Sequence, residues 1–106
     1  MGLDAAIYDE KEERQLAWKR LGNVSQVAFL RESAIRILGA QSLVASRVLC
    51  NATHSGDSLT TAELQPLAAE LQSLQSDRDA DVQVFARDML ELVHTATRYD
   101  RPIQFV

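Results

Sequence analysis

The amino-acid sequence predicts an all-α fold, a small antiparallel helical bundle of about four helices with a long central apolar helix. Helix-forming Ala, Leu, Glu, Gln and Arg dominate the 106 residues, and only two prolines and four glycines interrupt them. Apolar residues recur at the helical spacing of about 3.6 residues in the last three segments. The polar connections between segments are short, which favours antiparallel neighbours. We therefore expect a single helical domain over residues 1–106.

The first predicted helix covers residues 9–21 and has the weakest apolar face. Trp18 belongs to that face, but Glu10, Lys11 and Arg14 interrupt it. Acidic residues at the start suit the solvated opening turns of a helix, and the Gly-Asn pair that follows is typical of a helix end. Trp18 is the only tryptophan of the chain. Tryptophan is enriched both in cores and in interfaces, and we favour the core for Trp18 over an interface.

The predicted central helix covers residues 24–52, where apolar side chains occupy most of the circumference. Such a helix needs neighbours on several sides. Gly39 lies mid-segment and marks a kink, a break into two helices or a close backbone contact, and we favour one long helix. Phe29, Leu43 and Cys50 lie opposite the main apolar stripe. Because a bundle this small leaves that side uncovered, we expect a second copy to cover it in a homodimer.

Two further helices are predicted after a polar loop. Thr60 and Glu63 have the spacing of a capping box, which starts a helix over residues 61–75 with Pro66 in its first turn. The last helix, residues 81–99, has the cleanest apolar face in the chain. It is followed by a short apolar tail, which we expect to dock on the bundle itself or on a partner.

Composition and charge argue against several classes of function. The formal net charge is −4 and the pI is near 5.0, whereas binding to nucleic acid relies on basic residues that meet phosphates. No apolar run approaches the roughly 18 residues of a membrane span, and the N-terminus lacks the basic and apolar regions of a signal peptide. A single cysteine favours a reducing compartment. We therefore expect a cytoplasmic protein.

The sequence offers little for catalysis or cofactor binding. It has no Gly-rich phosphate loop, no Gly-x-Ser-x-Gly motif and no paired catalytic carboxylates, so we expect no enzymatic activity, no catalytic residue and no cofactor. Asp77, Asp79, Asp81 and Asp88 have part of the spacing of a calcium loop, but Val82 occupies the position where such a loop requires Gly. We interpret this acidic run as the N-cap of the last helix.

Cys50 and His54 are four residues apart and form the best candidate pair for a metal or a reactive thiol. One pair is too few for structural zinc, which takes four ligands. A lone cysteine in an apolar segment is more often a small core residue. We therefore expect no metal site, and a ligand- or metal-binding bundle is the last of our three hypotheses.

The leading hypothesis is a small intracellular protein-interaction module, of the inhibitor or immunity type, that neutralises a protein partner. An acidic body suits this role, because opposite charge steers association with a basic partner. A homodimeric structural or regulatory subunit is the alternative. The candidate partner-binding residues are the tryptophan, the charged face of the last helix and the apolar tail, namely Trp18, Arg87, Glu91, His94, Arg98, Ile103 and Phe105.

Overall fold

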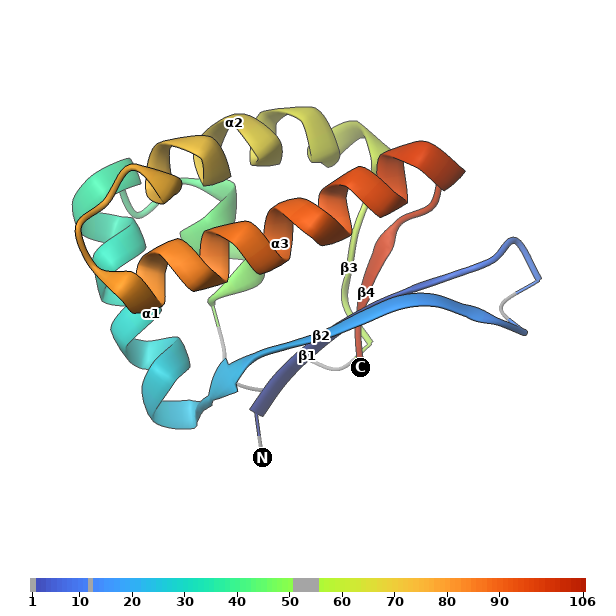
Figure 1. Cartoon of the computed structure of the whole chain (residues 1–106), viewed down its shortest axis with the longest axis horizontal. Coiled ribbons are helices and arrows are strands. Elements are labelled where there is room, and N and C mark those ends of the chain that lie inside the picture. The colour runs from blue at the N-terminus through green and yellow to red at the C-terminus, as the bar shows by residue number, and fades with distance from the viewer. Residues whose placement is uncertain (1, 12, 51–55) are drawn as a thin grey trace.

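A computed structural model describes residues 2–11, 13–50 and 56–106, and it has a mixed α/β fold (Figure 1). Within these residues four antiparallel strands form one sheet in the order β2-β1-β4-β3. The prediction of an all-α bundle is therefore wrong. Helices were predicted correctly in the second half of the chain, but the N-terminal segment and the C-terminal tail form strands.

The N-terminal segment is a hairpin of β1 (Gly2–Tyr8) and β2 (Gln15–Asn23), where we predicted a helix over residues 9–21. The charged residues between the strands form its turn: Asp9 Oδ1 accepts hydrogen bonds from the backbone N–H groups of Glu13 (3.0 Å) and Arg14 (3.4 Å). The charges that interrupted a helical face thus lie at an exposed hairpin tip, which extends past the helices in Figure 1.

The apolar tail is a central strand of the sheet. β4 (Ile103–Phe105) lies between β1 and the two-residue β3 (Ser58–Leu59), and both pairings are antiparallel. Ile103 and Phe105 are 0% and 2% exposed. The tail therefore docks on the protein's own core, which is one of the two placements expected for it.

The segment predicted as one long helix is broken at Gly39, so the single helix over residues 24–52 is wrong and the alternative of a break is correct. α1 (Val24–Leu38) ends there, because Gly39 has a φ of 98°, a left-handed conformation that disfavours other residues. The chain then forms a short π-helix, η1 (Val44–Val48). Part of the predicted helix, residues 51–52, lies outside the described residues.

The two helices predicted in the second half of the chain are confirmed. The capping box forms at the start of a 3₁₀ turn, η2 (Thr61–Glu63), which leads into α2 (Leu64–Gln75). α3 (Ala80–Tyr99) is the predicted amphipathic helix. Its N-cap is Asp79, whose Oδ1 accepts hydrogen bonds from two backbone N–H groups of the first turn at 2.9 and 3.2 Å. The acidic run is thus a helix cap, as predicted.

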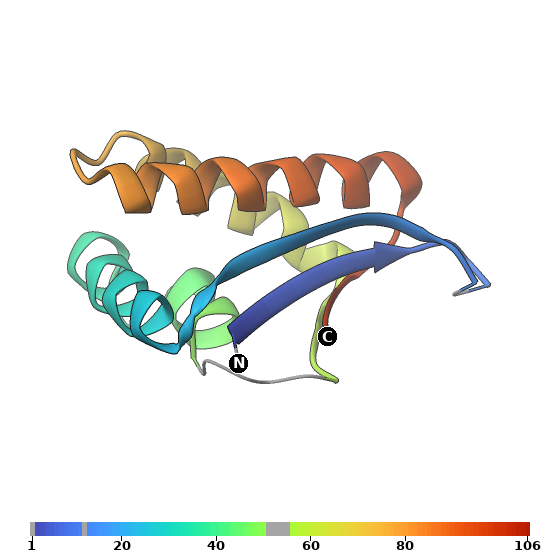
Figure 2. The same cartoon turned by 60° about the horizontal axis from the view of Figure 1, so that its bottom comes forward.

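α3 lies along one face of the sheet (Figure 2), and α2 packs against α3 on the side away from β1 and β2 (Figure 1). Apolar residues of strands and helices form one continuous core between these layers. Among the described residues, no helix is long and apolar enough to cross a membrane. At the end of the sheet where β2 runs directly into α1, the chain turns away from β1 and approaches the start of α3.

Candidate functional site

The residues predicted to bind a partner do not form one surface. Ile103 and Phe105 are buried and take no part in any surface of the folded chain. Trp18 lies on β2 and is 49% exposed, so the favoured placement in the core is wrong. Its neighbour Lys19 points to α3, where it forms ion pairs, so the alternation of side chains along a strand places Trp18 on the opposite face of the sheet. Trp18 is therefore separated from the charged face of α3.

Glu91 on α3 is engaged within the molecule. Its Oε2 lies 2.7 Å from Nζ of Lys19, and Asp88 Oδ1 lies 3.9 Å from the same atom. The hydrogen bond and the charge of Lys19 lower the pKa of Glu91 below its usual 4.5. The same hydrogen bond raises the pKa of Lys19 above its usual 10.5. Arg87 is a weaker member of this network, with its Nε 3.8 Å from Asp88 Oδ1.

This ion pair predicts a pH-dependent contribution to stability from Glu91. Because folding lowers its pKa, the contribution is complete above the usual value of 4.5 and is lost as the pH falls through the lowered value. We expect Glu91→Gln to melt slightly below the wild type at about pH 7, and the gap to close at about pH 2. Thermal unfolding, monitored by circular dichroism at each pH, measures the difference in melting temperature between the variant and the wild type. Glu10→Gln, at the exposed hairpin tip, is the control, and a gap that does not change with pH would contradict the assignment.

His94 and Arg98 lie together at a groove between α2 and α3, which has a volume of about 560 Å³. Its apolar wall includes Leu64 and Val93, which are 4% and 2% exposed and already belong to the core. The Arg98 guanidinium lies 5.6 Å from the centre of the Tyr99 ring. This groove brings two of the predicted residues together, but its apolar side chains are satisfied by the protein's own packing.

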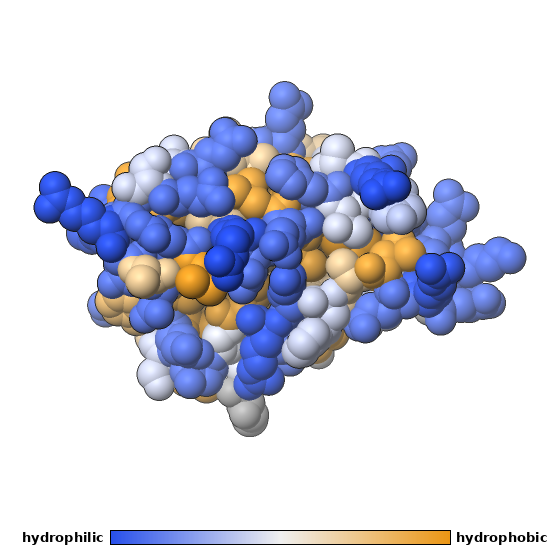
Figure 3. Space-filling model, viewed as in Figure 1, coloured by the Kyte–Doolittle hydropathy of each residue, from blue (hydrophilic) through white to orange (hydrophobic). Residues whose placement is uncertain are grey.

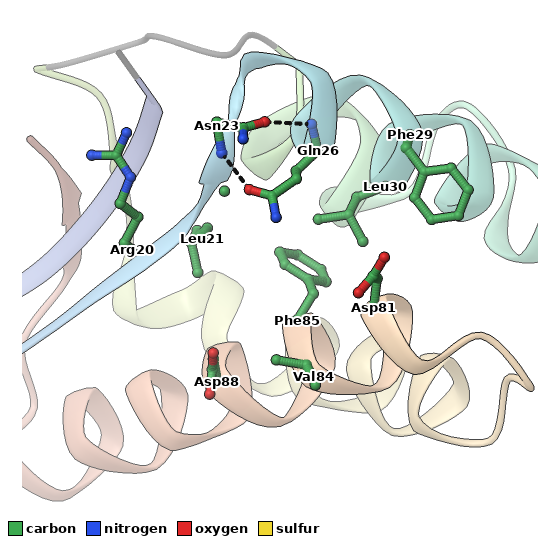
Figure 4. Close-up of a pocket in the computed structure, with 11 residues that line it drawn as sticks. Arg20, Leu21, Asn23, Gln26, Phe29, Leu30, Asp81, Val84, Phe85 and Asp88 are labelled. Atoms are coloured by element: carbon green, nitrogen blue, oxygen red, sulfur yellow. Dashed lines mark hydrogen bonds between the residues drawn. The ribbon is translucent and has the colours of Figure 1, made fainter.

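A different cleft lies where β2, α1 and α3 meet, and we name it the α1–α3 cleft (Figure 4). It has a volume of about 460 Å³. Leu21 from β2, Leu30 from α1 and Phe85 from α3 converge on its floor, and all three are largely buried. β2 continues into α1 without a loop, so α1 begins at the edge of the sheet and its first turns face the first turns of α3 across the cleft.

The junction between β2 and α1 is held by a capping box. Asn23 Oδ1 accepts a hydrogen bond from the backbone N–H of Gln26 at 2.9 Å, and Gln26 Oε1 accepts one from the backbone N–H of Asn23 at 2.8 Å (Figure 4). These reciprocal bonds satisfy two backbone donors at the helix start. Both side chains line the cleft, so its upper wall is fixed before any ligand arrives.

The lips of the cleft are two large apolar side chains that remain in contact with water. Phe29 on α1 is 42% exposed and Val84 on α3 is 44% exposed. Figure 3 shows apolar atoms at the surface of this face, where α1 and α3 approach each other, among hydrophilic side chains. Sequence reasoning placed Phe29 opposite the main stripe of its helix but did not select it. Val84 was missed, although an apolar residue on the otherwise polar side of α3 is the signal that marks it.

The rim of the cleft on α3 is acidic. Asp81, Val84 and Asp88 project from the same face of the helix, and the two carboxylates lie on either side of the valine. Arg20 borders the cleft from β2, but its guanidinium turns away from α3 (Figure 4) and lies 3.4 Å from Oδ2 of Asp4 on β1. The cleft therefore combines an apolar floor, apolar lips and a negative rim.

Of the pair Cys50 and His54, the structure describes only the cysteine. Cys50 is partly buried at the end of η1, and His54 lies outside the described residues. In the part of the chain that the structure describes, no three His, Cys, Asp or Glu side chains gather as metal ligands would. The α1–α3 cleft is the candidate functional site. Comparison of the chain with protein-family models, with curated proteins and with solved structures finds no match.

Proposed function

We propose that this chain is a protein-binding module whose α1–α3 cleft receives an apolar side chain of a partner protein. The observation that carries the proposal is the exposure of Phe29 and Val84, 42% and 44%, on either side of an apolar floor. When a partner covers large apolar side chains that border a cavity, the complex is stabilised by roughly 25 cal/mol per Å² of apolar area removed from water. Binding energy in protein interfaces concentrates in such pockets.

A small ligand is the competing occupant, since a volume of about 460 Å³ lies in the range of ligand sites. Ligand sites, however, bury most of the surface of their ligand. The lips of this cleft would stay in water around a small molecule. A partner surface that covers both lips removes that apolar area from water, and this favours a protein.

A second copy of the chain is a weaker occupant of the cleft. In a two-fold dimer the same patch faces itself, which would bring Asp81 and Asp88 of each copy towards those of the other. Like charges that face each other in an interface cost free energy. A basic partner avoids this cost, and the net charge of −4 assists its approach. We therefore favour the inhibitor or immunity type over the homodimeric subunit, and we propose a cytoplasmic location on the strength of the single cysteine.

Affinity capture with matched variants tests this proposal. The tagged full chain is used as bait in a lysate of its host, in parallel with Val84→Asp, Phe29→Ala and Val24→Asp. Val24 is the matched control, because it is 53% exposed, apolar and helical but does not line the cleft. An Asp at that position suits a helix start, so the fold is retained.

We expect the wild type and Val24→Asp to retain the same partner, and Val84→Asp to reduce its recovery at least about tenfold. Circular dichroism of each bait confirms that it is folded. Equal recovery by all four baits, or no partner with the wild type, would contradict the proposal. A loss caused equally by Val24→Asp would place the contact outside the cleft.

A further inference from the structure

We infer that the occupant of the α1–α3 cleft is an amphipathic helix with two basic residues seven positions apart and an apolar residue between them. This inference rests on the proposed function and names the class of partner segment. It is carried by the spacing of Asp81, Val84 and Asp88 along α3 and by the charges around them.

The two carboxylates on the rim differ in how far the protein compensates their charge. Asp81 is exposed, and its carboxylate makes no ion pair or hydrogen bond with any described residue. Asp88 has weak contacts, 3.9 Å to Lys19 and 3.8 Å to Arg87, and Lys19 lies much closer to Glu91 at 2.7 Å. Asp81 thus presents an uncompensated charge, and Asp88 presents one that Lys19 and Arg87 share only near the limit of ion-pair distance. A basic partner complements both charges.

The distance between these charges selects a helix. Asp81 and Asp88 are seven residues apart on α3, which corresponds to about 10.5 Å along the axis. A second helix presents residues seven apart on one face at the same spacing. A strand does not match, because its same-face residues recur at about 6.6 or 13 Å. Val84, which lies between the two carboxylates, then faces the partner residue three or four positions after the first of the two basic residues.

The shape of the site suits the same occupant. Phe29 on α1 and Val84 on α3 are the outer walls of a groove, and Leu30 and Phe85 lie beneath them. A helix that packs in the groove between two helices places one row of its side chains between them. An apolar residue of that row reaches the floor, and its basic neighbours reach the rim. This is helix-in-groove recognition, which is read through residues three, four and seven positions apart.

A displayed peptide library tests the inference with a defined probe. The library holds random helical peptides of about 16 residues, roughly four turns, and the full chain is the target. Peptides are selected on the wild type and then assayed against Asp81→Asn, Asp88→Asn and Val84→Asp. Glu10→Gln is the matched charge control, because it removes one acidic charge at the hairpin tip, far from the cleft. Circular dichroism verifies the fold of each variant.

We expect enrichment of Lys or Arg at two positions seven apart, with an apolar residue at the third or fourth position between them. Each Asn variant should weaken these peptides about three- to tenfold, Glu10→Gln should not, and the affinity should fall when NaCl is raised to about 0.5 M. Enriched peptides that depend on Val84 but lack the basic pair would overturn this inference and leave the proposed function intact. No enrichment of helical peptides would likewise overturn this inference alone. Enriched peptides that are insensitive to Val84→Asp would contradict both proposals.

Discussion

Replacement of Phe105 by Ala is expected to lower the free energy of unfolding by about 3–5 kcal/mol, the usual cost of removing a buried phenylalanine. The ring is 2% exposed and belongs to the central strand β4. The backbone of the same residue holds two neighbours: its N–H donates to the carbonyl of Asp57, and its carbonyl accepts from the N–H of Gly56, both at 2.9 Å. A cavity here loosens the contact between sheet and helices. Chemical denaturation in urea measures the loss.

Val106→Ala is the matched control for this prediction. It lies next to Phe105, is 45% exposed and removes apolar atoms from the surface rather than the core. Its effect should stay within about 0.5 kcal/mol. Equal effects of the two substitutions would show that the C-terminal strand is not packed in solution, and the tail would then be free to bind a partner.

The helices in the second half of the chain were predictable because their signals are local and long. α3 has 20 residues with apolar side chains repeated at helical spacing, and its N-cap and the capping box before α2 are recognised from single residues. The burial of Val82, Phe85, Met89 and Val93 follows directly from that spacing. Over several turns a helical period cannot be mistaken for an alternating one.

The strands were missed because their signals are short and ambiguous. In β1 the alternation of Leu3, Ala5 and Ile7 with polar residues is masked by Ala6, which is apolar and 0% exposed on the other face of the sheet. The turn of the hairpin contains charged helix formers instead of the Gly, Asn or Pro that announce a turn. β4 has three residues, too few for any period to emerge. Its pairing with β1 joins the two ends of the chain, which no local pattern encodes.

Most of the candidate site could not be predicted from the sequence, because it too depends on contacts between distant segments. The α1–α3 cleft brings together β2, the start of α1 and the first turns of α3. Two of its lining residues, Arg20 and Asp81, are about 60 positions apart in the sequence. The charged face of α3 was identified correctly as exposed at Arg87 and Glu91, but Lys19 of the missed strand compensates Glu91. Whether a surface charge is available therefore depends on the element opposite it.

Glu70 makes a second contact that depends on tertiary structure alone. Its carboxylate on α2 accepts hydrogen bonds from the backbone N–H groups of Leu43 (3.0 Å) and Val44 (2.9 Å), at the start of η1. These donors would otherwise be orphaned, as at every helix N-terminus, and Val44 is fully buried. The contact joins segments 26 and 27 residues apart. It fixes the chain after the break at Gly39.

Glu70→Ala is therefore expected to destabilise the fold by about 2–4 kcal/mol, since two donors lose a charged acceptor and one of them is buried. Glu70→Gln keeps one acceptor oxygen and should lose about half as much. Glu32→Ala is the control, because Glu32 is an exposed helical glutamate without a hydrogen bond or ion pair to the described residues. Urea denaturation measures all three. Amide hydrogen exchange adds a local readout, in which Leu43 and Val44 should exchange faster in Glu70→Ala. If Glu70→Ala and Glu32→Ala are equally stable and those two amides stay protected, the carboxylate does not hold η1.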